Sequence, residues 1–204
     1  MEIKLLAGGY YASNCYYVRN GNEALLIDPS VPFDDAMAQL GDGAVIPKTV
    51  LLTHAHFDHM FYLDEWRTRA GAALALHALE EPALHNPQIN LFGTFLHKEL
   101  VFDSAEILLQ EGDELSLDGE ALTVMHTPGH TVGSICLYGD GVIFTGDTIF
   151  TDGGYGRTDF YGGSEQALFD SIRRLKCLNV NATMYPGHGM HGNFKNEIDY
   201  FSFI

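Results

Sequence analysis

The order of strand-like and helix-like segments predicts an α+β protein built as a four-layer αββα sandwich. The chain gives a strand-rich run followed by helix and strand in alternation, and it gives this order twice, over approximate halves 1–104 and 105–204. It contains no tandem repeat and no low-complexity linker, so its 204 residues are expected to form one domain, 1–204, whose halves share a core. Two packed sheets with helices outside satisfy this order.

The first half is expected to begin with antiparallel strands. Short β-rich runs bounded by Gly, Asn and Asp occur at 3–6, 15–18 and 24–27. Apolar spacing then predicts, in order, a helix, a buried strand, a helix and a strand over 33–40, 49–52, 61–70 and 73–76. Residues 81–102 are rich in Pro, Asn and Gly, which predicts an irregular excursion over the surface.

The second half continues with strands separated by Gly-rich turns, over 114–117, 122–125, 134–138 and 142–145. Ser164 has the side chain and position of a helix N-cap, so a helix is expected from there to about 176. A last strand over 182–185 and a last helix over 193–203 complete the pattern.

Composition excludes several classes of function. The formal net charge is −16 with 11 Lys and Arg, which opposes binding to nucleic acid or to an anionic membrane surface. No apolar run approaches the ~18 residues that span a bilayer. The N-terminus has no signal-peptide pattern, and three isolated cysteines (Cys15, Cys136 and Cys177) are expected to be reduced, so a cytoplasmic protein is expected. Its acidic surplus is compatible with bound divalent cations.

The segment 53–59 predicts a metal site. His54, His56, Asp58 and His59 fall within six residues, directly after the expected strand 49–52. Imidazole and carboxylate groups at this density suit zinc, iron or manganese. Residues two apart can project to the same side of an extended loop, so His54 and His56 can share one ion. Asp58 and His59 lie further along and can face a second ion.

Three further candidate ligands stand in similar positions. His130, Asp147 and His188 each follow an expected strand and each lie next to glycine, which permits tight turns and close backbone approach. Four strand-end loops are therefore expected to converge on one rim of the sandwich.

Together these residues resemble the signature of the metallo-β-lactamase superfamily, and the resemblance covers nearly the whole chain. Within the superfamily, Gly-Arg-Thr-Asp-Phe at 156–160 with Gly-Gly-Ser at 162–164 resembles small single-domain hydrolases of the glyoxalase II type. Persulfide dioxygenases carry a similar run, but Tyr-Pro-Gly-His-Gly at 185–189 fits the hydrolases better.

The resemblance implies the metallo-β-lactamase fold and two divalent metal ions, with zinc favoured and iron or manganese open. His54, His56 and His130 would hold the first ion, Asp58, His59 and His188 the second, and Asp147 would bridge both. A metal-bound hydroxide would attack the carbonyl of a small-molecule thioester or ester. Asp58 would be the catalytic residue that orients the water or receives its proton.

Four residues are candidates for supporting or substrate-binding roles. Asp28 is expected to hydrogen-bond a ligand loop, with a simple turn-forming Asp-Pro as the alternative. Arg157 and Asp159 are expected to form an ion pair that fixes the loop after Asp147, although Arg157 could instead meet a substrate carboxylate. Tyr155 is placed in a loop near the metal rim, where it could contact substrate.

The function expected from all of this is a metal-dependent hydrolase of thioesters, similar to hydroxyacylglutathione hydrolases. Classical glyoxalase II has an additional glutathione-binding domain, which is not expected here, and basic residues are scarce, so the thiol is left open. Three alternatives also stay open: a persulfide dioxygenase with one iron held by His54, His130 and Asp147; a lactonase or other ester hydrolase; and a non-catalytic metal-binding module. The sequence predicts no oligomeric state.

Overall fold

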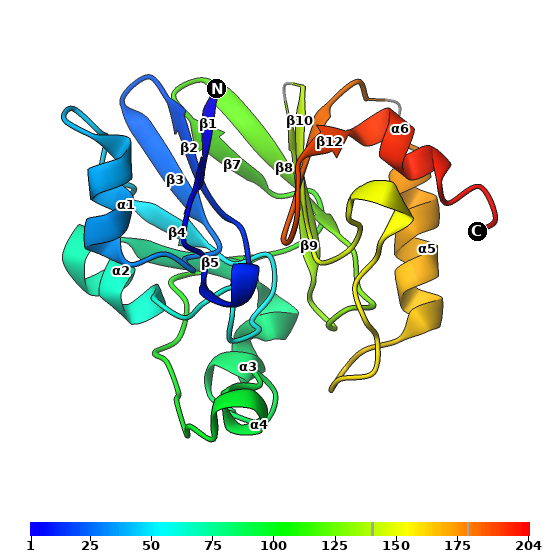
Figure 1. Ribbon diagram of the computed structural model, residues 1–204, viewed down its shortest axis with the longest axis horizontal. Helices are drawn as coiled ribbons and strands as arrows, with labels where there is room; N and C mark the ends of the chain where they lie inside the picture. Colours follow the sequence, from blue (N-terminus) through cyan, green and yellow to red (C-terminus); the bar gives the residue numbers. More distant parts are fainter. Residues whose placement is uncertain (140, 179) are drawn as a thin grey trace.

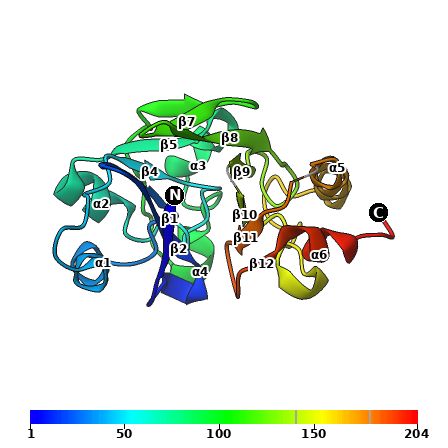
Figure 2. The same cartoon turned by 90° about the horizontal axis from the view of Figure 1, so that it is seen from above.

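Two six-stranded sheets lie face to face in the computed structural model, which describes residues 1–204 except 140 and 179. Helices α1 and α2 cover the outer face of one sheet, and α5 and α6 cover that of the other (Figures 1 and 2). The αββα arrangement that the sequence predicts is therefore confirmed.

The first sheet has the order β1-β2-β3-β4-β5-β6, with antiparallel pairing as far as β3 and parallel pairing beyond it. Parallel neighbours need crossovers, which α1 (Phe33–Leu40) and α2 (Leu63–Ala70) supply. The strands are β1 (Glu2–Leu6), β2 (Cys15–Asn20), β3 (Glu23–Ile27), β4 (Thr49–Leu51), β5 (Ala73–His77) and β6 (Ile107–Leu109). The sequence did not predict β6, so the first sheet extends past the expected boundary at 104/105.

The second sheet has the order β12-β11-β10-β9-β8-β7. Its strands are β7 (Glu114–Leu117), β8 (Glu120–His126), β9 (Ile135–Gly139), β10 (Val142–Gly146), β11 (Thr183–Pro186) and β12 (Gly192–Asn193). Helix α5 (Glu165–Lys176) begins after Ser164, whose Oγ accepts a hydrogen bond from the Ala167 amide, as predicted. The last helix, α6 (Phe194–Asp199), is shorter than the predicted range 193–203. Strand β12 occupies the residues just before it, and the helix ends at Asp199.

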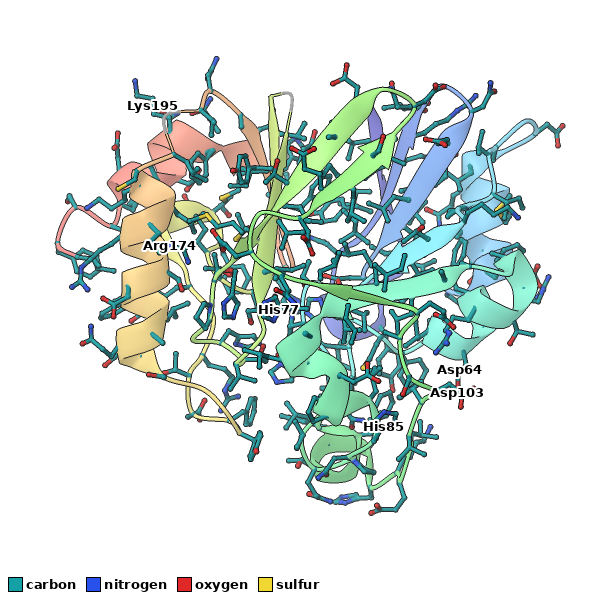
Figure 3. The ribbon with its side chains drawn as sticks, turned by 180° about the vertical axis from the view of Figure 1, so that it is seen from behind. Asp64, His77, His85, Asp103, Arg174 and Lys195 are labelled. Carbon is teal, nitrogen blue, oxygen red and sulfur yellow. The ribbon has the colours of Figure 1, made fainter. Side chains whose placement is uncertain are left out.

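The expected excursion contains two short helices, α3 (Glu81–Leu84) and α4 (Phe92–Leu96), which lie together below the sheets in Figure 1. β5 ends at His77 near the middle of the molecule, and the 3-10 turn η2 (Ala78–Glu80) leads from it into α3 (Figure 3). Two further 3-10 turns, η1 (Tyr10–Ala12) and η3 (Thr151–Gly153), lie in other loops.

Three apolar clusters fill the three spaces between the four layers. Strand β3 shows how side-chain alternation supplies them: Ala24 and Leu26 belong to the cluster facing α1 and α2, whereas Leu25 and Ile27 belong to the cluster between the sheets. The third cluster contains residues of both the second sheet and α5, including Ile143 and Ile172. Because both faces of the sheet are covered at β3, this strand reads as an almost continuous apolar run. In the described residues, no helix is long and apolar enough to cross a membrane.

Neighbouring residues of β6 provide a test of this packing. Leu109 is 3% exposed and belongs to the cluster between the sheets, whereas Leu108 is 50% exposed. We expect Leu109→Ala to lower the free energy of unfolding by about 2–5 kcal/mol because it opens a cavity. Leu108→Ala is expected to change it by less than about 0.5 kcal/mol. Urea unfolding of both variants measures the difference, and equal losses would contradict the burial of Leu109.

Candidate metal centre

The candidate ligands lie in loops at the carboxyl ends of four strands, which is where the sequence placed them. The loop between β4 and α2 carries His54, His56, Asp58 and His59. His130 follows β8, Asp147 follows β10 and His188 follows β11. The structure brings all seven together in three overlapping groups, and the potential ligand atoms within each group lie within 4.8 Å of one another.

Two of these groups correspond to the two expected ions. The first contains His54, His56 and His130, with His130 Nε2 at 2.9 Å from His56 Nδ1. The second contains Asp58, His59 and His188. In it, His188 Nε2 lies 3.2 Å from both His59 Nε2 and Asp58 Oδ2.

Asp147 lies between the two groups. Its Oδ2 is 3.6 Å from His130 Nε2 and 3.5 Å from His188 Nε2. Its Oδ1 is 3.4 Å from His59 Nε2. One carboxylate therefore reaches a histidine of the first group and histidines of the second, which is the position that a bridging ligand needs.

The hydrogen bonds on the outer ring nitrogens determine which nitrogens face inward with a lone pair. His130 Nδ1 donates to the Arg157 carbonyl at 2.8 Å, and His188 Nδ1 donates to the Ala12 carbonyl at 3.1 Å. His59 Nδ1 donates to Asp28 Oδ2 at 2.9 Å. In each of these rings the neutral tautomer then leaves the Nε2 lone pair pointing into the cluster.

His54 follows the same rule through Thr53. The Thr53 hydroxyl donates to Asp28 Oδ2 at 2.8 Å, so it accepts from His54 Nδ1 at 3.1 Å. His54 Nε2 is consequently an acceptor, and among the described residues it is buried with no hydrogen-bond partner, as is Asp147 Oδ1. Buried lone pairs that face one another are unfavourable unless a cation lies between them. The donor set and its geometry therefore fit divalent metal ions.

Two glycines show how closely the backbone approaches the cluster. A Cβ atom on Gly187 would lie 2.2 Å from Asp147 Oδ1 and 2.9 Å from His59 Cε1. A Cβ atom on Gly156 would lie 1.9 Å from the Asp147 carbonyl oxygen. A larger residue at Gly187 would displace Asp147 or His59, so the glycine next to His188 has the steric role that the sequence suggested.

Burial and the charge of neighbouring histidines favour the neutral forms of His54 and His56. Burial is the largest effect that lowers the pKa of His54 well below its ordinary value, and the neighbouring histidines add to it. Burial followed by His130 lowers the pKa of His56 in the same way. A neutral imidazole is the form that ligates a metal, so these two side chains need not lose a proton to do so.

At the histidines of the second group, nearby carboxylates outweigh the effect of burial on the pKa. Burial opposes the charged form of His59, but Asp58, Asp147 and Asp28 outweigh it and raise the pKa of His59 to about 10. Burial likewise opposes ionisation of Asp58, yet His59 and His188 lower the pKa of Asp58 to about 2. Burial also opposes the charged form of His188, but the hydrogen bond that His188 donates to Asp58 and the charge of Asp147 outweigh it and raise the pKa of His188. Positive charge is thus required here, and a divalent cation can supply it in place of these protons.

A model of the metallo-β-lactamase superfamily matches residues 8–188. The chain belongs to the metallo-β-lactamase superfamily. At the level of the superfamily, the chain is a metallo-hydrolase. Among curated proteins, it is 30% identical to "Probable metallo-hydrolase YqgX" of Bacillus subtilis strain 168, over 100% of this chain and 98% of that protein. It is also 30% identical to "Hydroxyacylglutathione hydrolase GloC" of Haemophilus influenzae, over 97% and 95% of the two chains.

Two solved structures of this superfamily cover almost all of the chain. The BLEG-1 B3 metallo-β-lactamase superposes with a TM-score of 0.89 at 30% identity, over 99% of both chains. TTHA1623, solved in a di-iron-bound form, superposes with a TM-score of 0.78 at 28% identity, over 100% of both chains.

Asp28 has the contacts expected of a residue that supports this superfamily's metal loop. It is 1% exposed, its Oδ1 accepts from the Thr53 amide at 2.8 Å, and its Oδ2 contacts Thr53 Oγ1 and His59 Nδ1. Its backbone has φ 54°, in the left-handed region that non-glycine residues seldom adopt. One carboxylate therefore fixes the tautomer of His59 directly and that of His54 through Thr53.

A second supporting carboxylate, Glu80, is not predicted from the sequence. It is 3% exposed, and its Oε2 accepts from the Ala55 amide, between His54 and His56, at 2.8 Å. Its Oε1 accepts from Thr131 Oγ1 at 2.7 Å and from the Gly133 amide at 2.8 Å. Glu80 thus joins the β4–α2 loop to the loop that carries His130. Its donors come from distant segments, so no local pattern around it could have revealed this role.

Of the remaining candidates, Arg157 and Asp159 contact each other, whereas Tyr155 packs against other residues. The expected ion pair between Arg157 and Asp159 is present, with two contacts of 2.6 Å, and the Arg157 guanidinium also lies 3.9 Å from the centroid of the Phe160 ring. Tyr155 points away from the cluster, because its ring packs on Phe169 of α5 and on Phe201. Tyr155 is not among the described residues that line the cleft beside the cluster, and its contact with substrate stays a prediction.

A cleft of about 290 Å³ opens onto the cluster. His56, Asp58, His130, Asp147 and His188 lie at its base. Its walls are mainly aromatic and apolar, and they consist of Tyr11, Phe57, Leu91, Phe95, Phe150, Gly156, Arg157 and Phe160. We refer to this space as the aromatic cleft.

Glu80 provides a test of how the ligand loops are supported. We expect Glu80→Gln to weaken metal binding about 10–100-fold, because an amide cannot accept from three donors at once and the two ligand loops lose their common partner. Competition with a chelator measures the metal affinity, and circular dichroism monitors the fold. Glu99→Gln, at an exposed position, is the matched control. Unchanged affinity in a folded Glu80→Gln protein would show that Glu80 does not support the ligands.

Proposed function

We propose that the chain is a dinuclear metal hydrolase that cleaves a small-molecule thioester. The observation that carries this proposal is the pair of ligand groups, one around His54 and one around His59, with Asp147 between them. Two separate groups of candidate ligands favour the binding of two metal ions over the binding of a single ion. Similarity to a relative named as a hydroxyacylglutathione hydrolase supports a thioester as the substrate.

The seven residues have distinct roles in this proposal. His54, His56 and His130 would hold one ion, Asp58, His59 and His188 would hold the other, and Asp147 lies where it could reach both. When bound, the ions supply a water molecule that is acidic enough to ionise near neutral pH, and they polarise the substrate carbonyl. Asp58 lies at the base of the aromatic cleft, where its carboxylate can orient the attacking water and accept its proton.

Zinc is the metal we propose, with iron or manganese as alternatives. A set of five imidazoles and two carboxylates is compatible with all three metals. The di-iron form of TTHA1623 shows that a structure similar to this one accepts iron. Metal identity is therefore a measurement to make together with activity.

Two other activities have specific support. Similarity to the BLEG-1 B3 metallo-β-lactamase over 99% of both chains favours β-lactam hydrolysis as a second candidate, since it also requires attack on a carbonyl. Lactone or other ester hydrolysis needs the same attack. A persulfide dioxygenase with one iron on His54, His130 and Asp147 is less favoured, because it would leave the group around Asp58, His59 and His188 without an ion.

The test of the proposed function combines metal analysis with a panel of substrates. We expect about two metal ions per chain and turnover of thioesters in preference to a lactone, a β-lactam and a persulfide. One iron per chain with oxygen consumption on the persulfide would instead identify a dioxygenase. Bound metal with no turnover of any compound would identify a non-catalytic metal-binding module.

Substitution of single ligands tests the roles within the cluster. We expect His56→Ala and Asp147→Ala each to lower kcat/KM by more than about a hundredfold, beyond the loss typical of an outer-shell partner, and to lower the metal content of a folded chain. His85→Ala and Asp42→Ala change exposed residues outside the cluster and serve as controls. Wild-type turnover in either ligand variant would contradict the proposed mechanism.

A further inference from the structure

The walls of the aromatic cleft are assembled from three segments outside the sheets. Phe95 of α4 stacks on Phe57 with ring centroids 5.1 Å apart, and it meets Phe160 edge-on at 5.7 Å. Tyr11 of η1 meets the Phe57 ring edge-on at 5.0 Å. Phe57 is the residue between His56 and Asp58 in the sequence, so this aromatic surface begins directly beside the metal ligands.

The part of this wall that α4 carries is fixed to the ligand loop by Asn90, which is fully buried. The Asn90 carbonyl accepts from the Phe57 amide at 2.9 Å, and its side chain donates to the Ala83 carbonyl at 2.9 Å and accepts from the Phe92 amide at 3.1 Å. Leu91 follows with φ 70°, a strained conformation that persists only where its surroundings impose it. The wall is therefore a preformed surface.

Away from the candidate ligands at its base, the walls of the aromatic cleft offer little positive charge to an anionic substrate group. Among the described residues that line it, Arg157 is the one that carries a permanent positive charge. Asp159 already neutralises this guanidinium through two contacts, and the Phe160 ring covers one of its faces. A substrate carboxylate would have to displace Asp159 to reach it.

We propose that the aromatic cleft binds a neutral, apolar acyl group, either aromatic or of medium chain length, and that Phe95 is a residue that determines this specificity. The proposal rests on the proposed thioester hydrolysis and names its substrate class. Phe95 is 40% exposed and contacts the wall by its ring faces and edges, so an acyl chain can bury apolar area against it. The cleft volume of about 290 Å³ accommodates such a group.

The first experiment compares thioesters of one neutral thiol, N-acetylcysteamine, that carry acetyl, hexanoyl, phenylacetyl or succinyl groups. Wild-type kcat/KM is expected to be about 10–100-fold higher for hexanoyl than for acetyl, which corresponds to burial of about two or three of the additional methylenes at about fourfold each. Phenylacetyl is expected to resemble hexanoyl, and succinyl to be the poorest of the four. Equal turnover of acetyl, hexanoyl and succinyl would overturn this inference while leaving thioester hydrolysis intact. No turnover of any thioester would overturn the proposed function itself.

The second experiment tests Phe95. We expect Phe95→Ala to lower kcat/KM for hexanoyl about tenfold or more while changing that for acetyl by less than about twofold. Phe95→Leu is expected to retain most of the preference. Phe203→Ala, which removes a ring that is 72% exposed at the opposite end of the chain, is the matched control. Equal losses for acetyl and hexanoyl in Phe95→Ala would show a structural role and contradict the assignment.

The third experiment tests the charge argument. Asp159→Asn removes the negative partner of Arg157, so we expect the ratio of succinyl to hexanoyl turnover to rise at least about fivefold. Thermal unfolding monitors whether the loop after Asp147 stays ordered. A folded variant with an unchanged ratio would show that Arg157 does not control the charge preference of the cleft.

Discussion

The hydrogen bonds on the outer nitrogens of the histidines are the interaction on which the rest of the site depends. They set the tautomers of the neutral rings, so the inner nitrogens are directed into the cluster as potential metal ligands. Their acceptors come from separate segments: the Ala12 carbonyl in η1, the Asp28 carboxylate after β3 and the Arg157 carbonyl after β10. The cluster therefore forms only when both sheets are packed. Direct links between the halves, such as the Ile135 amide to the Thr53 carbonyl at 3.0 Å, hold the ligand loops together.

Several residues with strained backbone conformations lie around this cluster and its cleft. Asp28, Tyr11 and Leu91 are non-glycine residues with φ of 54°, 51° and 70°, a conformation that costs on the order of 1–3 kcal/mol each. Asp28 supports the ligand loop, and the other two line the aromatic cleft. The surrounding packing offsets this cost, because the covered sheets fix the points where these loops begin and end. The Asp28 amide, for example, donates to the Leu51 carbonyl of β4 at 2.8 Å.

Local patterns made most of the fold predictable. The helix Phe33–Leu40 and the N-cap at Ser164 follow from side chains adjacent in sequence, and so does the placement of ligands after strands. Strands β6 and β12 escaped prediction because they contain only three and two residues and exist through pairing with β5 and β11. Pairing of that kind is tertiary, and no short window of sequence contains it.

The difference between local patterns and tertiary contacts also explains which parts of the site could be predicted. The candidate ligands share a recognisable spacing, whereas Glu80 is a single acid whose donors lie in two other loops. The sequence predicts Tyr155 in a loop near the metal rim, and its neighbours Gly156 and Arg157 do line the cleft. Sequence could not show that its ring turns towards α5, since adjacent side chains in an extended loop point in opposite directions.

Chemistry and specificity are thus assigned to different parts of the chain. The cluster is built from loops at strand ends, and the two sheets fix its geometry. The cleft walls come from η1, from α4 and from the loop after β10, none of which contributes a strand to either sheet. Phe57 belongs to both systems, because its amide is bonded to Asn90 while its neighbours are candidate ligands. Changing Phe57 would therefore disturb the ligands, whereas Phe95 lies one contact further out. A change at Phe95 can alter the shape of the cleft without moving the residues that perform the reaction.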